Sequence, residues 1–88
     1  MDKASFTMKV QFFGRIGDRI GREVGLDLPP DGCSVADLRS RLALLHPHAE
    51  ADLMSPSLRA CVDETIATED QIVSEGETVA FFPPLSGG

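Results

Sequence analysis

The end of the chain contains the residues with the clearest chemical potential. The sequence finishes with Gly87 and Gly88, and two terminal glycines would arise by chance in roughly one chain in 200, because glycine averages about 7% of residues. Without Cβ atoms, such an end can thread a channel that a side chain would block. A carboxylate is a poor acyl donor and must be activated, for instance as an acyl-adenylate, before sulfur or an amine attacks it. The pattern predicts a carrier whose reactive group is the α-carboxylate of Gly88 and whose partners supply the catalytic groups.

The rest of the chain offers few candidates for a catalytic or metal site. His46 and His48 flank Pro47 at the predicted end of a helix. This spacing suits neither two metal ligands on one helical face nor a base beside a nucleophile. The adjacent carboxylates at 63–64 and 69–70 predict turns and surface charge. The sequence therefore predicts no metal, no bound cofactor and no active site of its own.

Composition and charge narrow the class of protein. The 88 residues are 42% hydrophobic and 25% charged, which predicts one small globular domain. Residues 1–43 contain seven Lys/Arg and six Asp/Glu, whereas residues 44–88 contain one Arg and eight Asp/Glu. Nucleic acids and anionic membranes attract basic surfaces, so this imbalance disfavours both as partners. It favours a basic protein surface, although acidic groups that only maintain solubility would give the same pattern.

Targeting signals and disulfide motifs are not evident in the sequence. No apolar run approaches the roughly 18 residues of a membrane span, and no secretory leader pattern precedes the domain. We therefore expect a cytoplasmic protein. Cys33 and Cys61 are far apart and form no CxxC motif, which predicts two free thiols.

Two strands and a helix are predicted in the first half. Alternating apolar residues from Met8 predict a strand in which Phe13 lies on the polar side. Residues 23–28 alternate again and would pair with the first strand, with 14–21 as a long glycine-punctuated turn. A helix is predicted from Ser34, which resembles the start of a capping box, to just before Pro47. Its apolar stripe comprises Val35, Leu38, Leu42 and Leu45.

The second half predicts an irregular segment followed by strands. We expect a short helical turn around residues 49–54, a strand over 58–62, short apolar segments at 66–67 and 72–73, and a last strand over 78–82. This order predicts an α+β domain in which one main helix crosses a mixed sheet and the first and last strands pair in parallel. Residues 1–7 are predicted to be a disordered extension, 8–84 the domain, and 85–88 a flexible tail.

A candidate partner surface adjoins the start of this tail. Phe13 and Phe82 both point away from the predicted apolar face of their strands. If the first and last strands are neighbours, the two rings would form an exposed apolar patch, and aromatic side chains are typical of interface hot spots. The alternative is that another element of the same chain covers them.

Two stretches of the sequence resemble a known family. Residues 8–13 and the ending Phe81-Phe82-Pro83-Pro84-Leu85-Ser86-Gly87-Gly88 are similar to the small, sulfur-carrying subunit of molybdopterin synthase (the MoaD family). The resemblance covers about residues 8–88, and the ending is its most specific part. A terminal Gly-Gly alone would be shared with the thiamine sulfur carrier ThiS, with ubiquitin-related modifiers and with ubiquitin.

The resemblance implies a ubiquitin-like β-grasp fold, with four to five strands and one main helix, and a definite chemistry. An adenylating enzyme (MoeB-like), which uses ATP and Mg, would activate Gly88, and a sulfurtransferase system would convert it to a thiocarboxylate. The tail would then deliver sulfur to cyclic pyranopterin monophosphate in the large synthase subunit (MoaE-like), within a heterotetramer of two small and two large subunits. The residues implied in tail threading are Leu85, Ser86 and Gly87, and those in the partner interface are Phe13, Ile66, Phe82, Pro83 and Pro84.

Other roles remain open from the sequence. A ubiquitin-like modifier would use the same activation to join Gly88 to lysines of target proteins. A sulfur carrier could also serve thiamine synthesis or tRNA thiolation. A plain interaction domain with an inert tail is a third class, and it predicts that loss of Gly88 changes nothing.

Overall fold

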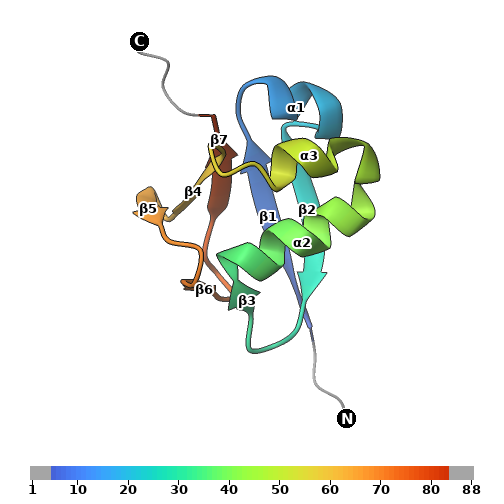
Figure 1. Ribbon diagram of the computed structural model, residues 1–88. Coiled ribbons are helices and arrows are strands. Elements are labelled where there is room, and N and C mark those ends of the chain that lie inside the picture. Colours follow the sequence, from blue (N-terminus) through green and yellow to red (C-terminus); the bar gives the residue numbers. More distant parts are fainter. Residues whose placement is uncertain (1–4, 84–88) are drawn as a thin grey trace.

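The computed structural model describes residues 5–83, so every expectation for residues 1–4 and 84–88 lies outside the described residues (Figure 1). Seven strands, three α-helices and one 3-10 helix follow one another in this part of the chain. The elements are β1 (Phe6–Phe12), α1 (Arg15–Ile20), β2 (Glu23–Leu28), β3 (Cys33–Ser34), α2 (Val35–Leu45), η1 (Pro47–Ala49), α3 (Glu50–Leu53), β4 (Arg59–Val62), β5 (Thr65–Ala67), β6 (Ile72–Val73) and β7 (Val79–Phe82).

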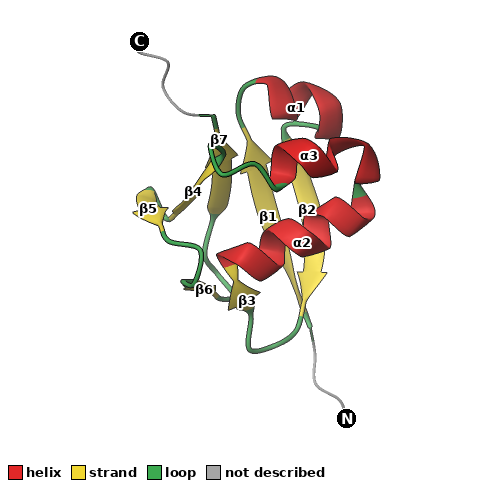
Figure 2. Cartoon of the chain, in the orientation of Figure 1, coloured by secondary structure: helices red, strands yellow, loops and turns green. Residues whose placement is uncertain are grey.

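The main sheet has five strands in the order β2-β1-β7-β4-β5. The β1–β7 pair is parallel and the other pairs are antiparallel. All three helices lie on one side of this sheet, with α2 crossing it (Figure 2). The predicted mixed sheet with one main helix across it is therefore confirmed, as is the parallel pairing of the first and last strands. This is the β-grasp arrangement that the resemblance implied.

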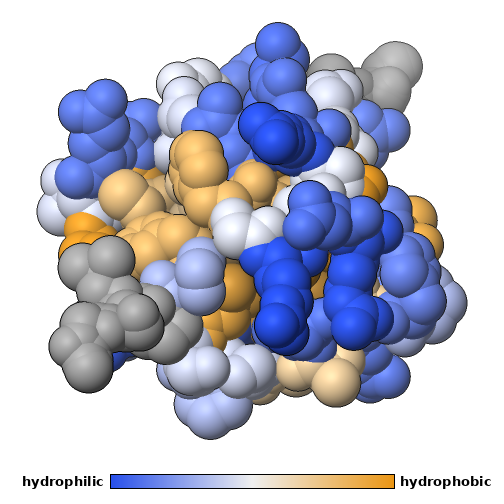
Figure 3. All heavy atoms as spheres, turned by 90° about the horizontal axis from the view of Figure 1, so that it is seen from above, coloured by the Kyte–Doolittle hydropathy of each residue, from blue (hydrophilic) through white to orange (hydrophobic). Residues whose placement is uncertain are grey.

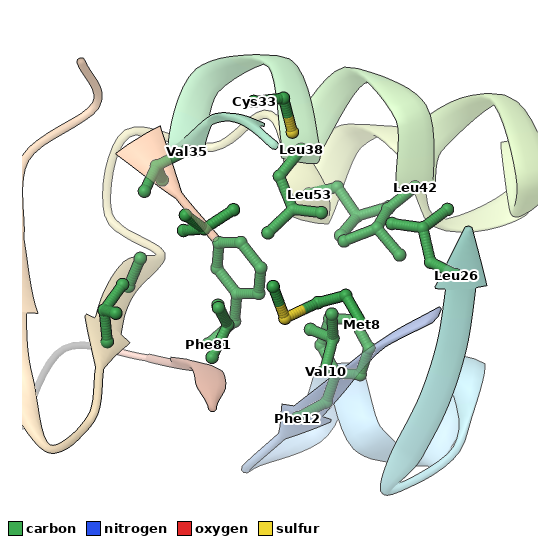
Figure 4. Packing of buried hydrophobic residues seen from close by; sticks show 14 of the residues in the cluster. Met8, Val10, Phe12, Leu26, Cys33, Val35, Leu38, Leu42, Leu53 and Phe81 are labelled. Atoms are coloured by element: carbon green, nitrogen blue, oxygen red, sulfur yellow. The ribbon is translucent and has the colours of Figure 1, made fainter. Parts of the chain in front are cut away.

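The core fills the space between α2 and the inner face of the sheet (Figure 4). The helix begins as predicted, because the Ser34 hydroxyl accepts a hydrogen bond from the backbone N–H of Asp37 at 3.1 Å. Val35, Leu38 and Leu42 are fully buried. The prediction for Leu45 is wrong, since its side chain is 57% exposed. Leu53 of α3 packs beside Leu42 in the core (Figure 4), in the place that the predicted stripe gave to Leu45.

Three local expectations differ from the structure. The segment predicted as a turn contains α1, and β3 pairs with β6 in a small second sheet. Helix α1 was not predicted because the glycines in and around it are typical of a turn. Gly17 instead allows close packing, since a Cβ there would lie 2.9 Å from the carbonyl oxygen of Phe12. Strand β1 starts at Phe6 because Phe6 and Thr7 pair with Leu28 and Asp27 of β2. These two residues therefore belong to the sheet and not to the predicted extension.

A buried arginine, which was not predicted, links α2 to the segments that precede β4 and β6. The side chain of Arg39 is 6% exposed and its guanidinium lies over the ring of Phe81, 5.3 Å from the ring centroid. It donates to the Glu69 carboxylate at 2.9 and 3.0 Å. Its other acceptors are the backbone carbonyls of Leu53, Ser55 and Leu58. One side chain thus holds residues 53–58 and Glu69 against the core.

Candidate functional site

Two phenylalanine pairs lie side by side at the centre of the sheet. Phe12 of β1 is opposite Phe81 of β7, and the backbone N–H of Phe13 donates to the carbonyl of Phe81 at 3.0 Å. The rings of Phe12 and Phe81 stack on the inner face, with centroids 5.8 Å apart. Because successive side chains alternate between faces, Phe13 and Phe82 both lie on the outer face. Phe13 is 53% exposed and Phe82 is half-buried.

The strand register places the third predicted contact residue on the same outer face. Gln11 is opposite Ala80, Ala80 is opposite Cys61, and Cys61 is opposite Ile66. These four residues therefore form one row across β1, β7, β4 and β5, and the Ile66 side chain is 56% exposed. The structure thus places Phe13, Phe82 and Ile66 on one face.

An open hollow of about 590 Å³ lies on this outer face. The sequence pattern does not by itself assign Gln11, Cys61 or Ala80 to a site, although the alternation in residues 58–62 and 78–82 places Cys61 and Ala80 opposite the core. The lining residues are Gln11, Phe13, Cys61, Asp63, Glu64, Thr78, Ala80 and Phe82.

The rim of the hollow includes an acidic hairpin turn. Asp63 and Glu64 have positive φ values of 49° and 72°, as in the tight turns that join antiparallel strands. The Asp63 carboxylate accepts from the backbone N–H of Thr78 at 2.9 Å, and the Asp63 N–H donates to the Thr78 carbonyl at 2.9 Å. The turn predicted here is therefore confirmed. It presents carboxylates beside an apolar floor, which suits a partner with basic groups around an apolar centre.

The end of β7 packs against the start of α1. Gly14 has a φ of 77°, and a Cβ on it would lie 2.8 Å from Cγ and 3.0 Å from Cδ of Pro83. Glycine therefore lets Pro83 lie close to the chain at this point, which fixes the direction in which the backbone leaves β7. Figure 3 looks down on this end of the molecule and shows apolar surface on the side of β7 and a mostly hydrophilic surface on the side of α1 and α3.

The remaining predicted site residues belong to the end of the chain. Pro84, Leu85, Ser86, Gly87 and Gly88 lie outside the described residues. The predicted site thus divides into an apolar outer face, which the structure describes, and a reactive end, which it does not.

The other candidate residues do not form a second centre in the described part of the chain. Nε2 of His48 lies 3.0 Å from the carbonyl oxygen of Arg19, and Arg19 also pairs with Asp52 at 3.2 Å. Within residues 5–83, His, Cys, Asp and Glu side chains form no group of three that could hold a metal ion. Among the same residues, no helix is both long enough and apolar enough to cross a membrane.

Fold and site together define a ubiquitin-like β-grasp protein with an open apolar sheet face beside the end of its last strand. The model of the ThiS family matches residues 10–88, which is most of the chain. The chain therefore belongs to the ThiS family.

Known proteins with similar sequences and structures include sulfur carriers and modifiers. The molybdopterin synthase sulfur carrier subunit of Escherichia coli (strain K12) is 33% identical over 84 residues, covering 92% of this chain and 99% of that protein. The crystal structure of SAMP1 from Haloferax volcanii has a TM-score of 0.80 at 24% identity, covering 94% of this chain and all of that one. A protein–protein complex of subunits 1 and 2 of molybdopterin-converting factor from Helicobacter pylori 26695 contains a chain with a TM-score of 0.61 at 15% identity, covering 94% of this chain and 100% of that one.

Proposed function

We propose that this protein is a sulfur carrier in molybdenum cofactor biosynthesis. The similarity to the Escherichia coli carrier over 99% of its length supports this role. The observation that supports it best in the structure is the placement of Pro83, which follows β7 directly beside the outward side chains Phe13 and Phe82. A partner seated on this outer face would therefore receive residues 84–88 at its own surface.

The proposed chemistry takes place on the α-carboxylate of Gly88. The carboxylate attacks the α-phosphate of ATP, bound with Mg by an adenylating enzyme, and pyrophosphate leaves. Hydrosulfide supplied by a sulfurtransferase system then attacks the acyl carbon, and AMP leaves with one former carboxylate oxygen, so that Gly88 ends in a thiocarboxylate. The thiocarboxylate sulfur attacks cyclic pyranopterin monophosphate, and water then cleaves its bond to the acyl carbon of Gly88 and regenerates the carboxylate. Two such deliveries supply both sulfurs of the dithiolene. This chain itself binds neither ATP nor metal in this scheme.

The partner in the transfer step is the large subunit of molybdopterin synthase. We place it on the outer face, where Phe13, Ile66 and Phe82 supply apolar contact and Pro83 and Pro84 lead into the tail. Two small and two large subunits would form the heterotetramer, in the cytoplasm. Five extended residues span at most about 18 Å, so the active site of the large subunit must lie within that distance of Pro83.

The first test is the intact mass of the protein purified from its own host, with fragmentation to locate any change. We expect sulfur in place of one oxygen at Gly88. If Gly88 is instead found joined to lysines of other proteins, the chain is a ubiquitin-like modifier and the proposal is wrong. If Gly88 carries sulfur but does not deliver it to cyclic pyranopterin monophosphate in the presence of the large subunit, the protein is a carrier for another pathway.

A deletion tests the role of the chain end separately. Loss of Gly88 should abolish sulfur transfer and leave the unfolding midpoint unchanged, because the buried core lies within residues 6–81. Removal of residues 1–4 from the other end is the control and should preserve transfer. Normal transfer without Gly88 would exclude the thiocarboxylate mechanism.

A further inference from the structure

A second apolar surface lies on the helical side of the molecule, away from the outer sheet face. The side chains of Leu44 and Met54 are 82% and 47% exposed. Two adjoining hollows of about 360 and 310 Å³ share Met54 and together form what we call the α2–α3 groove. Its lining residues are Ala36, Arg39, Ser40, Ala43, Leu44, Pro47, Glu50, Met54, Ser55, Pro56 and Glu69.

One face of α2 forms the long side of this groove. Ala36, Ser40, Ala43 and Leu44 follow the i, i+4, i+7, i+8 spacing of a single helical face. Three of the four are small, so another backbone can approach α2 closely. At 1.5 Å per residue, the face from 36 to 44 is about 12 Å long, which matches roughly two turns of a second helix.

The opposite wall of the groove is held in place from the core. Nη1 of Arg39 donates to the carbonyl of Leu53 at 2.8 Å and to that of Ser55 at 3.1 Å, the two residues that flank Met54. The backbone on both sides of Met54 is thus fixed by one buried guanidinium. A preformed wall lowers the entropic cost of binding, so the groove is suited to receive a partner without rearrangement.

The charge presented by the groove is negative. The charged residues in its lining are Arg39, Glu50 and Glu69. Arg39 forms an ion pair with Glu69 at 2.9 Å, so these two charges offset each other, and the net negative charge comes from the exposed Glu50. A second copy of this chain docked through the same surface would bring another Glu50 carboxylate to it, which disfavours self-association. Complementarity favours a basic partner.

We propose that the α2–α3 groove is a docking site for an amphipathic helix of a partner protein, with apolar residues on one face and Lys or Arg beside them. Apolar anchors at helical spacing would contact Leu44 and Met54, and a basic residue beside them would pair with Glu50. This inference does not depend on the proposed sulfur chemistry. Helices α2 and α3 lie on the inner side of the main sheet (Figure 1), so the groove that they line and the outer sheet face can both be occupied at once.

The probe for this site is a pair of synthetic peptides of about 14 residues, or roughly four helical turns. Both have leucine along one face; the other face has lysine in one peptide and glutamate in the other. Each peptide is titrated into isotope-labelled protein while the amide NMR signals are followed. We expect the lysine peptide to shift the amides of residues 36–44 and 50–56 and to bind at least ten-fold more tightly than the glutamate peptide.

Matched variants separate docking in the groove from general attraction to an acidic protein. Leu44→Glu should weaken binding of the lysine peptide at least ten-fold, although it adds a negative charge. Ile72→Glu adds the same charge at a 53% exposed apolar residue outside the groove, and it should not weaken binding. Glu50→Lys should shift the preference toward the glutamate peptide. These exposed positions allow the variants to fold, which the amide spectra verify directly.

Four results would overturn the proposal. Equal binding of the two peptides would exclude charge complementarity. Equal effects of Leu44→Glu and Ile72→Glu, or shifts confined to Phe13, Ala80 and Phe82, would place binding elsewhere. Concentration-dependent shifts of residues 36–56 without peptide would identify a second copy as the occupant.

Discussion

The two faces of the main sheet use the same strands for different purposes. Phe12 and Phe81 are 2% and 0% exposed on the inner face, whereas their neighbours Phe13 and Phe82 lie on the outer face, where Phe13 is 53% exposed. The residue type is the same in all four cases. What differs is the covering element, because α2 packs on the inner face and the described chain leaves the outer one open. Identical side chains thus stabilise the fold on one face and remain available for a partner on the other.

The largest effect expected from this comparison is on stability. Phe81→Ala should lower the free energy of unfolding by about 3–5 kcal/mol, because it leaves a cavity in the core and removes the ring that stacks on Phe12 and lies beneath Arg39. Urea denaturation followed by circular dichroism measures this. Phe82→Ala is the matched control and should lower the free energy of unfolding far less. Similar losses for the two variants would contradict the division between the faces.

The next effect is on binding. Phe82→Ala should weaken binding to the large synthase subunit by about 2 kcal/mol, or roughly 30-fold, as expected for an aromatic side chain at an interface hot spot. Isothermal titration calorimetry with the purified subunit measures it. Ile72→Ala, at an exposed apolar residue outside the outer face, should leave the affinity unchanged. Unchanged affinity for Phe82→Ala would remove Phe82 from the interface.

Periodicity made most of this fold predictable. Alternation in residues 23–28, 58–62 and 78–82 correctly assigned inner and outer side chains, since a strand has only two faces to choose between. The start of α2 at Ser34 followed from local capping chemistry. Alternation likewise predicts that Phe13 and Phe82 share the outer face, and the family resemblance adds Ile66 to them. Their role as a partner interface stays a prediction.

Features that depend on the packing of distant segments could not be predicted. Helical spacing places Arg39, four residues after Val35, on the apolar face of α2 and Arg41 off it. The acceptors of Arg39, which are three carbonyls and a carboxylate from distant segments, could not be predicted, whereas Arg41 forms a local surface pair with Asp37. The role of Gly14 depends on Pro83, which is far from it in sequence. Strand β3 is too short for any period to appear, and it is identified only by its pairing with β6.

A smaller effect is expected where the outer face meets the exit of the chain. Gly14→Ala and Gly21→Ala each place a Cβ on a residue whose positive φ and extended ψ favour glycine, and each should cost about 1–3 kcal/mol of stability. Only Gly14→Ala would also displace Pro83, because a Cβ on Gly21 would meet no atom within 4 Å. We therefore expect Gly14→Ala alone to slow sulfur transfer, roughly ten-fold, through misdirection of the tail. Equal transfer rates in the two variants would show that Pro83 does not guide the tail.

The smallest effect concerns the alkylation rates of the two thiols, because Cys33 is buried and Cys61 lies on the outer face. Burial, and then the nearby Asp37 carboxylate, raise the pKa of the Cys33 thiol above its ordinary value, so less reactive thiolate forms there near neutral pH. Cys61 is half-buried on the outer face. Iodoacetamide should therefore alkylate Cys61 faster than Cys33, as followed by peptide mass spectrometry, and the Cys33 rate should rise as the pH is raised.

Bound large subunit should protect Cys61 and leave the Cys33 rate unchanged. Equal protection of both thiols would indicate general stabilisation of the fold, and no protection of Cys61 would place the partner away from the outer face.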